Sequence, residues 1–110
     1  MNVQVNKTYR GLNLELIYDE VRDLVSRRGL VAVRSTIQTY GVSSGATQSR
    51  VTMPIRTSDG RDCGSLQILG ATNGDARMSL EFDDTIVSSE AIKAVHSDID
   101  FMFGPHEVQW

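Results

Sequence analysis

His96 and Asp100 are the residues of this chain whose types and spacing come nearest to reactive chemistry. They stand four positions apart, so on a helix both side chains project from one surface. A histidine and a carboxylate can act as two ligands of a metal ion, but a usable site needs a third and a fourth ligand. His106 and Glu107 are the nearest additions. The alternative, which we favour, is that His96 fills the apolar stripe of a helix and hydrogen-bonds a neighbour.

Cys63 is the only cysteine of the chain. A reactive thiol needs a nearby cation or histidine that lowers its pKa, and the neighbouring sequence offers only Arg61. Catalysis by Cys63 therefore requires that His96 approach it in the folded chain. A single cysteine forms no internal disulfide, and residues 1–6 lack the basic and apolar pattern of a secretory signal. We expect a cytoplasmic protein, and the initial Met1 favours a complete gene product.

A group of arginines is the second candidate site. Arg34, Arg50, Arg56 and Arg77 alternate with apolar residues along the predicted strands, and Glu81 is the one acidic residue in the same phase. These residues share the sheet face that points away from the helices if the apolar residues point toward them. Guanidinium groups suit carboxylates and phosphates, so this face is predicted to bind a small anion or an acidic protein partner. The alternative is a solvated sheet face whose arginines serve solubility.

The strongest structural signal is a central hairpin. Apolar and polar residues alternate from 51 to 55 and again from 66 to 68, and Asp59-Gly60 between the two runs is typical of a tight hairpin turn. Pro54 has no amide hydrogen to donate, which indicates an edge strand or a bulge.

The same hairpin resembles the central hairpin of GAF-type sensory domains. Met53-Pro54-Ile55, Asp59-Gly60 and Gly64-Ser65-Leu66 are similar to an apolar-Pro-apolar strand, a tight turn and a Gly-x-Leu strand of that family. The similarity covers under a fifth of the chain, and the segment between the first helix and this hairpin is too short for the ligand pocket usual in the family. The resemblance implies a binding role, and no functional residue is carried over.

The remaining elements are predicted from periodicity and caps. Apolar residues recur at helical spacing after Asn13 and after Ser88, both of which are good N-caps, and Gly29 and Gly104 end these runs. In the strand that follows the first helix, Val31, Val33 and Ile37 are expected on one face and Arg34, Thr36 and Gln38 on the other. The predicted elements are strand 2–9, helix 13–28, strands 30–40, 49–57, 63–69 and 77–82, and helix 88–103.

These elements predict a single α+β domain over residues 1–110. We expect one antiparallel sheet of four to five strands with two helices packed on one face. The net charge of −3 gives no reason to expect nucleic-acid binding, and no apolar run approaches the roughly 20 residues that cross a membrane. No cofactor motif is present in the sequence.

Three functions are open at this point. The favoured one is a non-enzymatic binding or regulatory module that uses the arginine-bearing face. The second is self-association into a homodimer that buries the open sheet face, with Pro54 marking an edge. The third is a small enzyme or metal protein that uses His96 and Asp100.

Overall fold

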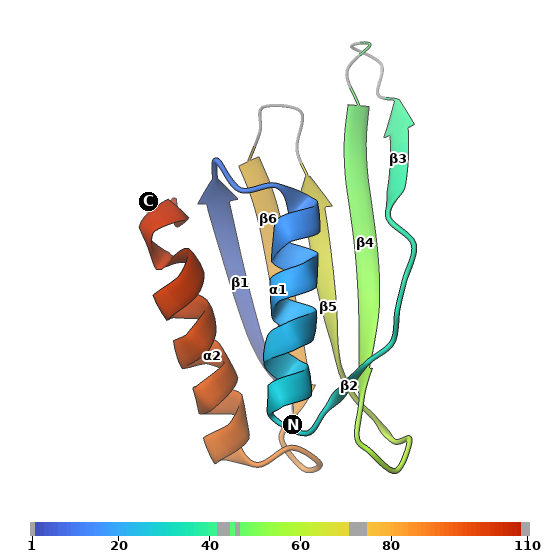
Figure 1. Cartoon of the computed structure of the whole chain (residues 1–110), viewed down its shortest axis with the longest axis vertical. Coiled ribbons are helices and arrows are strands. Elements are labelled where there is room, and N and C mark those ends of the chain that lie inside the picture. Colours follow the sequence, from blue (N-terminus) through green and yellow to red (C-terminus); the bar gives the residue numbers. More distant parts are fainter. Residues whose placement is uncertain (1, 42–44, 46, 71–74, 109–110) are drawn as a thin grey trace.

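The computed structural model describes residues 2–41, 45, 47–70 and 75–108 (Figure 1). Its six strands form one antiparallel sheet in the order β1-β6-β5-β4-β2, and β3 also pairs with β4. Both helices cover the same face of this sheet, and the other face is open (Figure 1). The predicted α+β class is therefore confirmed. The elements are β1 (Asn2–Arg10), α1 (Leu14–Arg27), β2 (Val31–Ala32), β3 (Gln38–Gly41), β4 (Thr47–Arg56), β5 (Asp62–Gly70), β6 (Asp75–Asp83), α2 (Ser89–Phe103) and the short 3-10 helix η1 (Gly104–His106).

The ends of the helices follow from their capping residues. The Asn13 side chain accepts a hydrogen bond from the amide of Glu15 at 2.7 Å, and Ser88 Oγ accepts one from the amide of Ala91 at 3.1 Å. At the end of α1, Gly29 adopts φ 80° and the amide of Leu30 returns to the carbonyl of Val25 at 3.0 Å. This geometry satisfies carbonyl groups that the helix itself leaves unpaired.

The core lies between the helices and the inward face of the sheet. Alternate residues of β4, β5 and β6 point toward the helices and are almost wholly buried, as the sequence predicts. Burying a side chain of this kind contributes about 1.5–3 kcal/mol, so alternation fixes which face of each strand is covered. The inward residues are Val51, Met53 and Ile55 of β4, Leu66 and Ile68 of β5, and Met78, Leu80 and Phe82 of β6.

The central hairpin forms as expected, and it contains a β-bulge. Ile55 pairs with Gly64 whereas Arg56 pairs with Asp62, so Cys63 is the extra residue of β5. Gly64 is required at this point, because a Cβ atom there would overlap the backbone oxygen of Glu81 in β6.

Pro54 does not lie on an edge strand, which corrects one of the two positions predicted for it. Strand β4 has β5 on one side and β2 and β3 on the other. The carbonyl of Pro54 accepts the amide of Val33 at 2.8 Å, so the nitrogen of Pro54 faces the same outer neighbour. Because that nitrogen carries no hydrogen, the outer ladder stops here. The single strand expected over 30–40 is therefore divided into β2 and β3.

The division also changes the alternation of the outer strand. From Val31 to Gln38 the chain advances seven residues, while β4 advances six from Arg56 to Arg50. One extra residue reverses the phase, so Val31 lies on the open face and is 47% exposed instead of facing the helices. Ile37 packs against the core as predicted.

Candidate functional site

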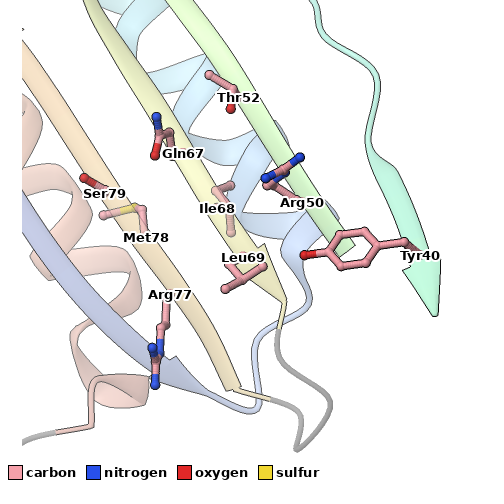
Figure 2. A pocket seen from close by; sticks show the side chains of 9 residues that line it. All are labelled: Tyr40, Arg50, Thr52, Gln67, Ile68, Leu69, Arg77, Met78 and Ser79. Atoms are coloured by element: carbon pink, nitrogen blue, oxygen red, sulfur yellow. The ribbon is translucent and has the colours of Figure 1, made fainter. Parts of the chain in front are cut away.

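A pocket of about 310 Å³ opens on the sheet face that the helices leave uncovered (Figure 2). It lies across the three central strands near the ends where β4 begins and β5 finishes, and one residue of β3 closes its outer side. The lining residues are Tyr40 of β3, Arg50 and Thr52 of β4, Gln67, Ile68 and Leu69 of β5, and Arg77, Met78 and Ser79 of β6.

Strand register places the two arginines of this pocket in one row. Arg50 pairs with Leu69, and Leu69 pairs with Arg77. Two strand spacings separate the arginine Cα atoms, which is about 10 Å. Figure 2 shows Leu69 between the two arginine side chains. The row therefore has a cationic group at each end and an apolar residue in the middle.

Tyr40 forms the outer wall and contacts Arg50. The guanidinium carbon of Arg50 lies 5.9 Å from the centre of the Tyr40 ring, and the ring extends from β3 toward β4 (Figure 2). A cation over an aromatic ring is held by the ring quadrupole, so this contact orients the Arg50 side chain without neutralising its charge. Tyr40 is 40% exposed, which leaves its ring accessible to a ligand.

A row of uncharged polar side chains borders the arginine row. Thr52 pairs with Gln67, and Gln67 pairs with Ser79. This row lies two residues along each strand from the arginine row, at a distance of about 7 Å. A second hollow of about 280 Å³ adjoins the first because both are lined by Arg50, Thr52 and Gln67, and Thr36 and Gln38 complete it. The floor therefore offers both hydrogen-bond donors and acceptors.

The arginines of the chain differ in whether they have a carboxylate partner. Arg56 Nε lies 2.8 Å from Asp62 Oδ1, and among the described residues four further arginines are paired with an aspartate in this way. Within the described part of the chain, neither Arg50 nor Arg77 has a carboxylate within ion-pair distance. Their charges are therefore available to an external anion.

The structure brings together only two of the four predicted arginines. Arg50 and Arg77 line the pocket, whereas Arg56 lies six residues along β4, roughly 20 Å away. Arg34 lies in the break between β2 and β3 and lines neither hollow. The extra residue in this segment reverses the alternation, so counting alternate positions back from Gln38 does not establish the face on which Arg34 lies.

Alternation placed four arginines and only one acidic residue, Glu81, on the open face, and this count of acidic residues is wrong. The pairs Arg10–Asp75 and Arg56–Asp62 place two carboxylates on the open face beside arginines, and Asp83 lies there opposite Asn2. Each of these aspartates is the first or last residue of its strand, and the sequence pattern there is typical of a turn. Positive charge is local to the Arg50–Arg77 row.

Two pocket residues were missed by the sequence analysis. Tyr40 is the last residue of the strand predicted over 30–40, and continuing the alternation two positions beyond Gln38 would have assigned it to the open face. Leu69 was hidden because it follows Ile68 directly and so interrupts the apolar alternation of β5. An apolar residue at a polar position of a strand is the signal that identifies it.

His96 and Asp100 line a different pocket, between the edge of β1 and α2. Its volume is about 330 Å³, and Val5, Asn6, Lys7 and Ile99 complete its lining. Burial lowers the pKa of His96, although the charge of Asp100 raises it. His96 Nε2 is buried without a hydrogen-bond partner. The predicted hydrogen bond that would satisfy this nitrogen is therefore absent among the described residues.

The described residues contain no group of three or more histidine, cysteine, aspartate or glutamate side chains placed to hold a metal ion. Cys63 is buried in the bulge of β5, where its thiol donates to the carbonyl of Ile55 at 3.5 Å. Burial raises the pKa of this thiol. Cys63 does not line the pocket of His96, so the arrangement required for catalysis by this pair is not formed.

No protein family, curated protein or solved structure matches this chain. The resemblance of the hairpin to GAF-type domains therefore rests on the hairpin residues alone. No helix within the described ranges is both long enough and apolar enough to cross a membrane.

Proposed function

We propose that this protein is a non-enzymatic binding module that holds a small organic anion on the open sheet face. The observation that supports this proposal is that one pocket contains both Arg50 and Arg77, neither of which has a carboxylate partner among the described residues. Leu69 and the Tyr40 ring beside them suit an anion with an apolar body.

The pocket suggests how such a ligand would be held. A carboxylate or phosphate group accepts hydrogen bonds from the guanidinium of Arg50 or Arg77. The apolar body of the ligand covers Leu69 and the exposed side of the Tyr40 ring. Thr52 and Gln67 then hydrogen-bond polar substituents of the ligand, which selects among anions of similar size.

Small aromatic anions test the proposal directly. Phenyl phosphate and benzoate are titrated into ¹⁵N-labelled protein, with benzyl alcohol as a neutral probe of the same ring. We expect the anions to shift the amide resonances of Arg50, Gln67 and Arg77 and benzyl alcohol to leave them in place. Comparison of the two anions distinguishes phosphate from carboxylate recognition.

Arginine variants make the test specific to this pocket. Arg50→Gln and Arg77→Gln should each weaken binding about tenfold, because each removes a charge-assisted hydrogen bond. Arg56→Gln is the matched control, since Arg56 lies on the same face but is already paired with Asp62. Equal binding by all three variants, or an equal response to benzyl alcohol, would contradict the proposal. Binding of an acidic protein with no response to either small anion would instead assign the face to a protein partner.

A further inference from the structure

The two arginines of the pocket are held apart from each other. Tyr40 of β3 contacts Arg50 on the side of β4 that faces away from β6. Figure 2 shows the Arg77 side chain pointing away from Arg50, with Leu69 between the two. Their Cα atoms are two strand spacings apart, about 10 Å, whereas a hydrogen bond spans about 3 Å. A single carboxylate held at one guanidinium group therefore does not reach the other.

The residues in the same row carry no negative charge. Gln38 of β3 lies opposite Arg50, and Thr8 of β1 lies opposite Arg77. Leu69 is the residue that separates the two arginines. The row therefore has two positive charges, and none of these described neighbours compensates either one.

Charge complementarity favours a ligand with two anionic groups. Asp75 lies two residues from Arg77 along β6, but its carboxylate is 3.4 Å from Arg10 Nε and is paired there. A monoanion bound at one arginine of the pocket leaves the other without a counter-charge. A dianion of the right length supplies a counter-charge to both.

Leu69 and Tyr40 determine what suits the middle of such a ligand. The Leu69 side chain is half-buried in the floor of the pocket, and the Tyr40 ring is accessible beside it. A polar group placed over Leu69 would lose hydrogen bonds to water and gain none from the protein, whereas an apolar group would cover apolar surface. The pocket of about 310 Å³ has room for an aromatic ring with a charged group at each end.

We infer that the ligand of this pocket is an elongated organic dianion that lies across β4, β5 and β6. One anionic group binds Arg50, the other binds Arg77, and the apolar body covers Leu69. This inference rests on the proposed function and narrows it, because it adds a second anionic group and fixes its position relative to the first. A dicarboxylate with its two groups at opposite ends of an apolar body is the simplest ligand of this class.

Three benzene carboxylates separate the effect of length from the effect of charge. Terephthalate carries carboxylates at opposite ends of the ring, phthalate carries two on adjacent carbons, and benzoate carries one. Binding is measured by isothermal titration calorimetry at one fixed ionic strength, since salt screens the attraction of the pocket for every anion. We expect terephthalate to bind about tenfold more tightly than benzoate, because only terephthalate forms a charge-assisted hydrogen bond at each end. Phthalate has the same charge as terephthalate but should bind within about threefold of benzoate.

Arginine variants locate the two ends of the ligand. The informative quantity is the ratio of terephthalate affinity to benzoate affinity within one variant. Loss of an arginine weakens the attraction for every anion, and a change in the folded fraction affects both ligands alike, so neither alters this ratio. The ratio should fall from about tenfold to about threefold or less in Arg50→Gln and in Arg77→Gln. It should stay at about tenfold in the matched control Arg56→Gln, since Arg56 is paired with Asp62.

The outcomes distinguish this inference from the proposed function. Benzoate binding that depends on Arg50 and Arg77, without a preference for terephthalate, would overturn the dianion and still support an anion pocket. Equal affinities for terephthalate and phthalate would also overturn it, because charge alone would then explain the gain over benzoate. A pocket that binds neither these carboxylates nor phenyl phosphate would contradict the proposed function itself.

Discussion

The hydroxyl of Tyr18 in α1 holds the backbone of Ser35 at the point where the outer strand of the sheet is interrupted. The amide of Ser35 donates to Tyr18 Oη at 2.9 Å, and Tyr18 Oη donates to the carbonyl of Ser35 at 3.4 Å. The Ser35 hydroxyl in turn donates to the carbonyl of Val33 at 3.1 Å. That carbonyl would otherwise accept an amide hydrogen from residue 54, which proline lacks. Helix α1 and Ser35 thus satisfy the backbone groups that Pro54 leaves unpaired.

Tyr18→Phe should therefore destabilise the protein. The variant keeps the buried ring but removes both hydrogen bonds to Ser35, leaving a partly buried amide without its partner. We expect a loss of about 1–2 kcal/mol in the free energy of unfolding, measured by urea denaturation. Tyr40→Phe is the control, because Tyr40 is exposed and its hydroxyl lies on the open face. Equal stability of the two variants would show that Ser35 does not depend on the Tyr18 hydroxyl.

Gly64→Ala should be strongly destabilising. Its added methyl group would overlap the backbone oxygen of Glu81 and press on the Phe82 ring, both of which are fixed by strand pairing. We expect a loss of about 2–3 kcal/mol, measured by thermal or urea unfolding. Gly104→Ala adds the same methyl group where no atom lies within 4 Å, with an ordinary helical φ of −52°. The Gly104→Ala control should leave the free energy of unfolding unchanged or raise it slightly. A similar loss of stability in both variants would argue that the overlap with Glu81 is not the cause.

The pH dependence of stability should contain a contribution from His96. Burial lowers its pKa below the ordinary value of 6.5, so the unfolded chain binds a proton here more readily than the folded chain. This contribution to stability is complete above pH 6.5 and is lost as the pH falls from there toward the lower folded-state pKa. His96→Gln should therefore lose less stability than the unmodified chain between pH 7.5 and 5.5. Parallel curves for the unmodified chain and His96→Gln would contradict the prediction.

The ion pair between Lys7 and Glu107 should contribute to attachment of the C-terminal segment to β1. Lys7 Nζ lies 2.9 Å from Glu107 Oε1, and the Glu107 side chain is only 17% exposed. The hydrogen bond to Glu107 raises the pKa of Lys7. We expect Glu107→Gln to cost about 1 kcal/mol, read from urea unfolding.

Asp23→Asn provides the comparison for this pair. The Asp23–Arg27 pair is equally close at 2.8 Å, but both side chains are more than 60% exposed. Its loss should cost no more than about 0.5 kcal/mol, since solvent screens the interaction. A larger loss of stability in Asp23→Asn than in Glu107→Gln would contradict the prediction, because the less exposed pair is expected to contribute more.

The sequence predicts those parts of the fold that depend on local patterns. The stripe and cap of α1, the alternation of β4 and the Asp59-Gly60 turn each involve neighbours in the chain, and all three are confirmed. The division of the outer strand could not be predicted in the same way. It depends on Pro54, which lies about 20 residues from the segment that it interrupts and acts only once the strands are paired.

The candidate site was predictable only in part for the same reason. Arg50 and Arg77 were assigned to the open face by alternation within their own strands. Their meeting in one row depends on how β4, β5 and β6 align, which alternation does not specify. The phase of Arg34 depends on the extra residue in the interrupted strand, and that residue has no local signature.

The extra residue between β2 and β3 shifts the side-chain alternation of the outer strand by one position. Ala32 before it and Ile37 after it both pack against the core, although an odd number of positions separates them. Removing one residue from 33–36 would leave six positions between Val31 and Gln38, as β4 has between Arg56 and Arg50, so Gln38 and Tyr40 would stay on the open face. The extra residue therefore accommodates the break opposite Pro54 and leaves the orientation of the pocket residues unchanged.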